Sequence, residues 1–419
     1  MPVSDVTAAV PAWDAERKRC APLYDYYRGK QRLRFATDDF RRKYGSMVAD
    51  LRENICVPAV TGFVDEIQIE SWSGGAVDRS LADEMDRLSD LVFTELFRTG
   101  NAYVIVSERA DGSRLAVYQP SDSVVPVVDA EDPTVLAHAV KVWVDARRFG
   151  RALVLYTDRV ERYVTSSEVV AARGSVVRMP TDESGWFADG DEADPHVEAH
   201  DFGAVPVVWF KRDPDDMWGA GHSILSDVLP LQDLLNKSLA DAAILAEAYS
   251  RPLYYILKMA AQAAVPTLPG QTNPLAGAVT NGPDLPVSRR PPFDATRQQI
   301  LAVDGEGPVG KFEPSDLSKL VEMRADVRQS VSNVTGLPSF HFIPTGGDVP
   351  SGESLKVISR RQAAVVRRAT LPSVPVWRGL MQLLGFDATP VFRDVNAAVT
   401  PAAPAAPTTA DREGQLPPA

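Results

Sequence analysis

Residues 97–106 read FRTGNAYVIV, and this short stretch predicts how the first half of the chain folds. Before it, apolar residues recur at helical spacing from Leu81 to Phe97, and Gly100 is the residue type that most often follows the end of a helix. From Ala102 onward the sequence is rich in β-branched and aromatic residues, which favour a strand. The stretch therefore predicts a helix that ends at Gly100 and passes directly into a strand.

Strand-like runs continue beyond this stretch. Asp111 and Gly112 form a turn signal between residues 102–107 and 114–118, which predicts an antiparallel hairpin. Further strands are expected at residues 135–144, 152–157, 159–165 and 205–211. The sequence thus predicts an α+β fold in which antiparallel hairpins dominate up to about residue 211.

After Gly219 the pattern becomes helical. Ser226 is expected to cap a helix that continues to about residue 250, and a second helix is expected over residues 314–336. Between them, residues 251–313 are rich in Pro and Gly. The apolar stripes of the two helices include Leu231, Leu234, Leu235 and Leu239 in the first and Leu317, Leu320, Val327 and Val331 in the second.

Helical spacing returns after residue 352. A third helix is predicted towards Ala369, where Pro372 is expected to end it because proline lacks the N–H that helix hydrogen bonding needs. A further helix is predicted over residues 374–384, ended by Gly385. Residues 387–419 are expected to form a disordered tail, since the chain beyond Ala397 is rich in Ala, Pro and Thr.

Composition narrows the possible classes of protein. The chain has 419 residues, 45% of them hydrophobic, and a formal net charge of −12. An acidic balance argues against a general nucleic-acid binder that wraps phosphates, but not against a protein past which DNA must slide. The two cysteines, Cys20 and Cys56, lack metal-ligand spacing and suit a reducing compartment. No apolar run is long enough to span a membrane, and no signal peptide is recognised, so we expect a soluble protein made in the cytoplasm.

One motif resembles a nucleotide-binding loop. Residues 305–311 read GEGPVGK and match the spacing G-x-x-x-x-G-K. A phosphate-binding loop also needs Ser or Thr after the lysine and a helix that begins there, whereas Phe312 follows Lys311 and Pro314 delays the helix. We interpret the match as accidental and expect no cofactor.

Other polar groups do not form a catalytic pattern. Residues 189–200 concentrate Asp, Glu and His, but their spacing fits neither a calcium loop nor a zinc site, and a solvated acidic hairpin loop is the preferred interpretation. The five histidines lie outside any triad or metalloprotease motif, and Ser223 lacks the following glycine of a nucleophile elbow. The sequence therefore predicts no catalytic residue and no metal site.

Two basic stretches remain open to several interpretations. Residues 17–52 hold eleven Lys or Arg against four Asp, and a second run lies on the helix predicted after residue 352. Either stretch could contact DNA phosphates, form salt bridges between subunits or lie on a solvated helix face. Spacings of seven place the arginines of the second run on one stripe of their helix. The residues of this run are Lys356, Arg360, Arg361, Arg367 and Arg368.

Six stretches in order resemble the portal proteins of siphovirus-type tailed phages, particularly those of actinobacterial hosts. They are YDYYRG at residues 24–29 with LRF at 33–35, NICVPAV at 54–60, FRTGNAYVIV at 97–106, FGAVPVVWF at 202–210 followed by GHSILSDVLPLQDLLN at 221–236, TGLP at 335–338, and SGESLK at 351–356. Two features depart from the family pattern. Ser354 stands where alanine is usual, and the chain ends soon after Asp394, which implies a reduced or absent crown.

The resemblance implies a division of the chain into the parts of a portal subunit. Residues 1–225 would be the mixed α+β wing, 226–250 and 314–336 the two stem helices, and 251–313 the clip between them. Residues 337–352 would be the tunnel loop, and 353–386 a long helix with the base of wing or crown. The stem residues named above would form the subunit interface. The tunnel-loop residues expected to face DNA are Thr345, Gly346, Gly347 and Asp348.

The resemblance also implies a function and partners. Twelve copies would form a ring at one capsid vertex, in the virion, after assembly in the host cytoplasm. DNA would pass through the ring during packaging and ejection. The expected partners are double-stranded DNA, the terminase large subunit, the major capsid and scaffolding proteins and a head-tail connector protein, with no membrane. Two alternatives are a nucleotide-dependent enzyme that uses residues 305–311 and a virion scaffold without a channel.

Overall fold

The computed structural model describes residues 3–31, 38, 42, 52–109, 111–132, 134–169, 177–190, 196–214, 220–250, 254–256, 300–302, 309–311, 318–343 and 352–394. The chain divides into two compact units. The first comprises Met1–Leu33, Glu53–Leu234 and Ala325–Ala419, and the second comprises Arg34–Arg52 and Leu235–Arg324. The α+β class expected from the sequence is confirmed, because helices and sheets both contribute to the first unit.

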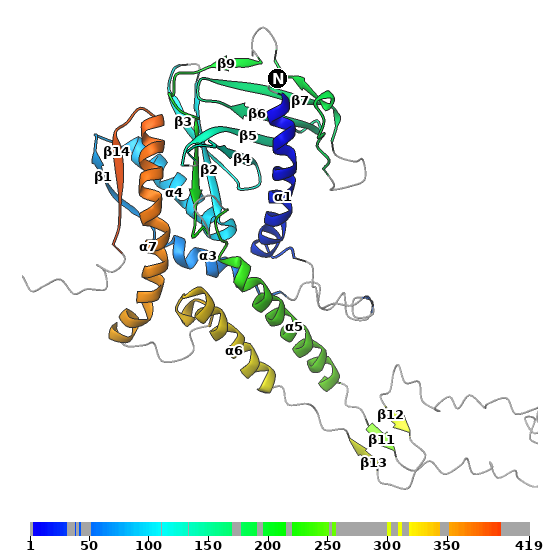
Figure 1. The fold of residues 1–419 in the computed structure, drawn as a ribbon. Helices are drawn as coiled ribbons and strands as arrows, with labels where there is room; N and C mark the ends of the chain where they lie inside the picture. Colours follow the sequence, from blue (N-terminus) through cyan, green and yellow to red (C-terminus); the bar gives the residue numbers. More distant parts are fainter. Residues whose placement is uncertain are drawn as a thin grey trace, which may run out of the picture. The chain divides into compact units, whose positions relative to one another are not determined.

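A six-stranded antiparallel sheet forms the largest element of the first unit (Figure 1). Its strands run in the order β4, β5, β6, β7 and β8, and β9 pairs with β7. Their bounds are Val124–Val128, Leu136–Val144, Phe149–Leu155, Arg159–Glu168, Trp186–Ala188 and Val197–Ala199. The hairpins expected in this part of the sequence are therefore present.

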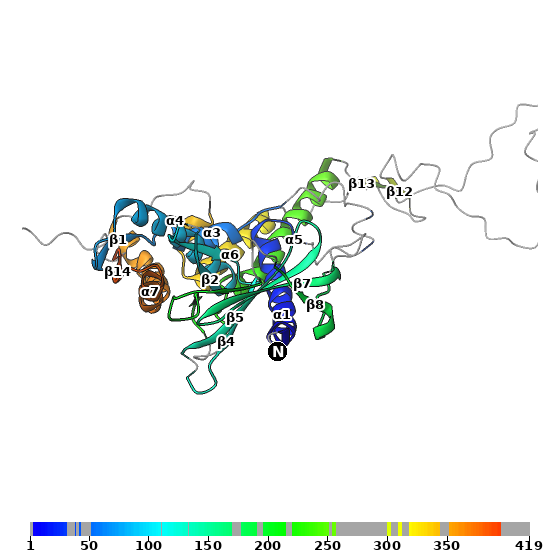
Figure 2. The same ribbon diagram turned by 90° about the horizontal axis from the view of Figure 1, so that it is seen from above.

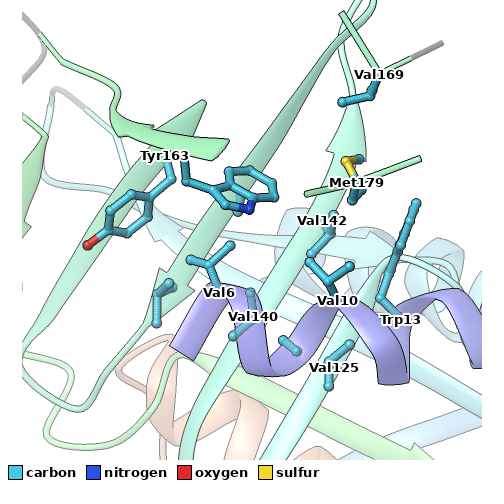
Figure 3. Packing of buried hydrophobic residues seen from close by; sticks show 13 residues of the cluster. Val6, Val10, Trp13, Val125, Val140, Val142, Tyr163, Val169 and Met179 are labelled. Atoms are coloured by element: carbon cyan, nitrogen blue, oxygen red, sulfur yellow. The ribbon is translucent and has the colours of Figure 1, made fainter. Parts of the chain in front are cut away.

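Helix α1, Val3–Tyr27, covers one face of this sheet (Figure 3). Val6, Val10 and Trp13 lie on one side of the helix and pack against Val140 and Val142 of β5. All five side chains are at most 5% exposed, so this face of α1 is held by apolar burial. The helix ends before Gly29, whose φ of +66° is a left-handed conformation that glycine adopts readily.

The predicted passage from helix to strand is confirmed. Helix α4, Arg79–Thr99, is capped by the side chain of Asp78 and ends at Gly100 in the left-handed conformation. Strand β2, Asn101–Glu108, follows at once and forms a hairpin with β3, Arg114–Gln119. Strand β10, Val207–Lys211, pairs with the other edge of β2. The three strands form a sheet in the order β10, β2 and β3.

Helix α3 and strands β1 and β14 also belong to the first unit. Helix α3, Cys56–Val64, precedes strand β1, Ile69–Gly74, which pairs with β14, Ala388–Phe392. The predicted disordered tail over residues 387–419 is therefore wrong at its start. Residues 388–392 have an antiparallel partner in β1, and Ala388 is fully buried. Residues 395–419 lie outside the described residues.

Helix α7, Gly352–Leu383, contradicts the prediction that Pro372 ends a helix. It continues through Pro372 and Pro375, both of which are exposed. The carbonyl groups that these prolines leave without an N–H partner can therefore be hydrated, so the cost of each proline is reduced. Buried side chains on both sides, such as Ala369 and Trp377, also hold the helix against the body. Packing thus overrides a local helix-breaking signal.

The two helices expected after residue 219 are both present. Helix α5 spans Leu225–Ser250 and α6 spans Ser318–Thr335, and each runs from one unit into the other. The predicted cap is wrong in one respect: Oγ of Ser223, not of Ser226, accepts from the Leu225 N–H at 3.1 Å. In the second unit, strand β11 (Tyr254–Ile256) pairs with β12 (Ile300–Ala302) and with β13 (Val309–Lys311).

Among the described residues, no helix combines the length and the apolar composition that crossing a bilayer requires.

Candidate functional site

Two glycines that lie far apart in the sequence touch at the start of α5. The backbone of Gly100, with φ of +95°, lies against the backbone of Gly221. A Cβ atom on Gly100 would lie 2.1 Å from the Gly221 carbonyl oxygen, and one on Gly221 would lie 1.9 Å from the Gly100 carbonyl oxygen. Neither position can hold a side chain without moving backbone. We call residues 97–101 together with 221–225 the helix-root junction.

Hydrogen bonds join the two halves of the helix-root junction. The Asn101 Oδ1 atom accepts from the Gly221 N–H at 2.9 Å, and the Ile224 N–H donates to the Phe97 carbonyl at 3.1 Å. The Ser223 hydroxyl donates to the Arg98 carbonyl at 2.6 Å and is 1% exposed. The junction therefore connects the end of α4 directly to the first turn of α5.

Polar side chains also hold the following turns of α5. The Gln232 Oε1 atom accepts from the Ile55 N–H at 2.8 Å, and its Nε2 atom donates to the Glu53 carbonyl. The Tyr26 hydroxyl donates to the Asp233 carboxylate at 2.7 Å. Gln232 is fully buried, so its bonds fix the rotation of α5 about its own axis.

Helix α6 is also held by Glu53, the residue whose carbonyl Gln232 bonds. Arg328 of α6 donates twice to the Glu53 carboxylate, at 2.9 and 2.6 Å. The Ser332 hydroxyl donates to the Leu337 carbonyl at 2.6 Å, which secures the turn that follows α6. Because Glu53 contacts Arg328 with its side chain and Gln232 with its backbone, one residue connects both helices to the body of the first unit.

A buried charge network lies beside the helix-root junction. Glu95 of α4 is fully buried, accepts from the Tyr24 hydroxyl at 2.6 Å and from the Ser121 N–H at 2.9 Å, and pairs with Arg98. Arg98 also lies 4.7 Å from the centre of the Tyr24 ring. Burial raises the pKa of Asp122, and the nearby Glu95 carboxylate raises it further. The network thus ties α1 to α4 at the cost of crowding carboxylates.

Glu16 and the two cysteine thiols show opposite pKa shifts. Burial acts to raise the pKa of Glu16, but hydrogen bonds from Arg19 and Ser121 outweigh it and hold the pKa below its usual value. Burial raises the pKa of the Cys56 thiol to about 12, and that of the Cys20 thiol likewise to about 12. Both cysteines are free and buried, so neither has the thiolate character that reactivity requires.

The residues predicted on the stem interface are only partly buried. Leu235, Val327 and Val331 are at most 5% exposed, whereas Leu234 is 41% exposed. Leu231, Leu239 and Leu320 are half-buried, and Leu317 lies outside the described residues. On α6, Val321 and Val334 are also exposed, at 68% and 47%. Each helix therefore presents apolar area to its surroundings in addition to its buried contacts.

Thr345, Gly346, Gly347 and Asp348, which are predicted to form a tunnel loop, lie outside the described residues. In the basic run, Arg360, Arg361, Arg367 and Arg368 are exposed on α7, and nothing is described of the Lys356 side chain. No carboxylate among the described residues pairs with any of the four arginines. Their spacing on one helix matches the predicted stripe.

Only parts of the motifs considered for catalysis lie among the described residues. Val309–Lys311 is strand β13, and the rest of the G-x-x-x-x-G-K match lies outside the described residues. The part of the chain that the structure describes contains no group of three metal-ligating side chains placed to hold an ion. Ser223, weighed as a nucleophile, instead caps α5.

Sequence reasoning missed the residues that secure the two helices. Gln232, Asp233, Glu53 and Asn101 carry no catalytic motif, and their partners are up to 275 residues away. The sequence does carry one usable signal. Gly100 follows α4 and Gly221 precedes α5, and both lie in stretches that resemble the portal family, residues 97–106 and 221–236.

The fold and the site define a structural subunit that roots long helices in a mixed α+β body. The chain belongs to the family of phage portal proteins of the SPP1 Gp6-like type, whose model matches residues 10–285. This family is structural rather than catalytic. The match includes the helix-root junction and all of α5.

Comparison with solved structures gives remote likenesses. The structure described as "Neck of native GTA particle computed with C12 symmetry" has 15% identity and a TM-score of 0.42, over 85% of this chain and 84% of that chain. "Virion of native gene transfer agent (GTA) particle" has 14% identity and a TM-score of 0.42, over 84% and 82%. No curated protein sequence matches this chain.

Proposed function

We propose that this chain is the portal subunit of a tailed-phage-type particle. Copies of it would form a ring, which we expect to contain twelve subunits, at one vertex of the capsid. The ring would be the channel for DNA packaging and ejection. Membership of the portal family over residues 10–285 is the observation that carries this proposal.

The order of elements supports the assignment of parts to the ring. Two helices, α5 and α6, flank the Pro- and Gly-rich residues 251–313, as stem helices would flank a clip. At 1.5 Å per residue, the 26-residue α5 and the 18-residue α6 would extend about 39 and 27 Å. Their polar anchors in the first unit suit a stem that must keep a fixed direction under load.

The exposed apolar residues of both helices support assembly. Val321 and Leu234 are 68% and 41% exposed, and such side chains on otherwise amphipathic helices gain by burial against another subunit. A ring in which each subunit covers the helices of the next would bury them. Leu231, Leu239, Leu317 and Leu320 belong to the same proposed interface, whereas Leu235, Val327 and Val331, which were expected there, are already buried within the subunit.

The net charge of −12 supports a channel that does not retain DNA. A channel wall without net attraction for phosphate lets the duplex move both ways without a deep electrostatic minimum. Thr345, Gly346, Gly347 and Asp348 are proposed to face the DNA as a tunnel loop. The proposed partners are the terminase large subunit, the capsid and scaffolding proteins and the head-tail connector.

Electron microscopy of the purified protein tests the proposal. We expect closed rings with a central hole and cyclic symmetry, and mass photometry should give a mass near twelve copies of the chain. Particles that lack a hole would favour the channel-less scaffold. Hydrolysis of ATP by the purified chain that is lost in Lys311→Ala would favour the nucleotide-dependent enzyme.

A further inference from the structure

An acidic pocket lies where α4, the end of α3 and the start of β1 meet. Its volume is about 530 Å³. Three carboxylates line it: Asp65, which follows α3, and Asp86 and Asp90, which are one turn apart on α4. All three residues are exposed, and none has an ion-pair partner among the described residues. Thr61, Gln68 and Thr94 add polar groups to the same wall.

A second observation marks this pocket as a binding site. Ser89 of α4 also lines it and is 3% exposed, yet its hydroxyl has no hydrogen-bond partner among the described residues. A buried hydroxyl without a partner is unfavourable, so such groups in native proteins usually meet a partner that the isolated chain lacks. Ser89 lies between Asp86 and Asp90 along the helix and lines the same pocket.

The electrostatics favour a cation here. Burial raises the pKa of Asp86, and the nearby Asp83 and Asp90 carboxylates raise it further. Burial also raises the pKa of Asp90, with a further contribution from Asp65. The pocket therefore holds negative charges whose mutual repulsion a bound cation would relieve. Arg87, the basic residue next to them on α4, pairs with none of these carboxylates among the described residues.

The same unit presents the opposite charge on α7. Arg360, Arg361, Arg367 and Arg368 are exposed, whereas Ala363, Val366, Ala369 and Trp377 form the buried side of that helix. Helix α7 lies beside β14 (Figure 2). Its buried side also packs towards α3 and α4, because Gln362 donates to the Gly62 carbonyl at 2.7 Å and the ring centres of Trp377 and Phe93 lie 6.5 Å apart. The four arginines thus lie on the exposed side of α7, where the Arg361 side chain also packs against Gly336.

We propose that the acidic pocket formed by Asp65, Asp86, Ser89 and Asp90 receives arginine side chains from α7 of the adjacent subunit. The inference rests on the proposed ring and names the contact that would close it. Each subunit carries both surfaces, and no ion pair joins them among the described residues. A head-to-tail arrangement pairs the pocket of each copy with the arginines of the next.

The dimensions and chemistry fit a guanidinium group. A bare metal ion draws its ligands to within about 2.6 Å, whereas this pocket is large enough for a long side chain with its charged end. Arginine presents five N–H donors in a plane, so one group can bond a carboxylate bidentately and still donate to a hydroxyl such as that of Ser89.

Charge reversal of one surface at a time tests the inference. We expect Asp86→Arg/Asp90→Arg to fold, since both positions are exposed and arginine favours helix, but to raise the concentration for half-maximal ring assembly at least about tenfold. Arg367→Glu/Arg368→Glu should give a similar rise. Mass photometry across a concentration series measures both, and circular dichroism checks that each variant is folded.

Mixing the two variants is the decisive step. In an alternating ring, the arginines introduced into one pocket meet the glutamates of the other variant, and the remaining interfaces are those of the wild type. The equal mixture should therefore assemble where each variant alone does not, and a chain that carries all four changes should also assemble. Failure of both the mixture and the four-change chain to assemble would overturn the inference.

The controls separate this inference from the proposed function. Glu131→Arg/Glu183→Arg changes two exposed carboxylates elsewhere in the same unit by the same charge, and we expect its assembly to match the wild type. Wild-type protein that never forms rings would refute the proposed function itself. Rings of Arg367→Glu/Arg368→Glu that form normally but fail to retain DNA would assign the arginines to DNA and overturn the inference.

Discussion

The helix-root junction and the acidic pocket use polar groups in opposite ways. In the junction, Asn101 and Ser223 each have partners across the two segments, and the nearby Gln232 bonds two backbone groups. In the pocket, Asp86 and Asp90 repel one another, and the Ser89 hydroxyl has no partner among the described residues. The first region is complete within one subunit, whereas the second has unsatisfied bonding capacity.

This difference separates folding from assembly. A group whose partner is present in the same chain contributes to the free energy of unfolding of that chain. A group without such a partner adds nothing to the free energy of unfolding or lowers it. Such a group stabilises the protein only when a second molecule supplies the partner. Changes in the junction should therefore lower the stability of the subunit. Changes in the pocket should alter assembly while leaving the subunit as stable or more stable.

The largest effect is expected at the two touching glycines. Gly221→Ala places a Cβ atom 1.9 Å from the Gly100 carbonyl oxygen, and Gly100→Ala adds an unfavourable φ of +95° to a similar overlap. Backbone must move in either variant, so we expect a loss of about 4 kcal/mol or more in the free energy of unfolding. Urea denaturation followed by circular dichroism measures the loss.

Gly379→Ala is the matched control for these variants. Gly379 lies within α7, and a Cβ atom there would meet nothing within 4 Å. We expect it to be neutral or to stabilise the chain by up to about 1 kcal/mol, because alanine favours helix over glycine. Equal losses for Gly221→Ala and Gly379→Ala would refute the close contact.

A smaller but still large effect is expected in the buried charge network. Glu95→Gln removes the charge that pairs with Arg98 and leaves that guanidinium, 15% exposed, without its partner. Loss of one member of a buried pair costs about 3–5 kcal/mol. Glu70→Gln, an exposed change in β1, should stay within about 0.5 kcal/mol. The double variant Glu95→Gln/Arg98→Met should recover part of the loss, whereas no recovery would show that the pair is not the cause.

Much of the fold could be predicted from local sequence. Gly100 marks the end of α4, and the strands that follow it are rich in β-branched and aromatic residues. The α+β class and most hairpins could therefore be predicted from the sequence. The contact between Gly100 and Gly221 could not, because it joins positions that only the tertiary fold brings together. For the same reason the local sequence favours Ser226 as the cap of α5, whereas Ser223 fills that role in the structure.

The failures at Pro372 and at β14 have a related cause. Pro372 is a strong local signal to end a helix, but α7 continues because its buried side chains on both sides of the proline hold it. The composition of residues 387–419 suggests a disordered tail, yet five of these residues pair with β1, more than 300 positions earlier. Local patterns predict elements, and packing decides where they begin and end.

The third prediction concerns how the stability of the subunit depends on pH through Asp122, in the buried charge network. Burial and the neighbouring Glu95 carboxylate raise the pKa of Asp122 above its ordinary 3.8. A raised pKa means that ionisation of Asp122 costs the folded state stability as pH rises through its folded pKa, while below about 3.8 the group is neutral in both states. Asp122→Asn should therefore raise Tm at pH 7, by less than about 4 °C, and the gain should vanish near pH 3.5. Thermal scans between pH 3.5 and 7 measure it, and a gain that grows towards low pH would contradict the assignment.

The smallest effect is expected at Ser89, and it distinguishes the two regions most sharply. Ser89→Ala removes a buried hydroxyl that has no partner among the described residues, so the free energy of unfolding of the isolated subunit should stay within about 0.5 kcal/mol or rise. If an arginine of the next subunit bonds this hydroxyl, the same change should weaken ring assembly by about threefold to tenfold. Ser223→Ala is the matched comparison, because its hydroxyl bonds the Arg98 carbonyl within the subunit and its loss should lower stability by about 1–3 kcal/mol. Denaturation and mass photometry on the two variants should therefore give opposite patterns. Ser89→Ala that destabilises the subunit as Ser223→Ala does would show that the hydroxyl already has a partner within its own chain.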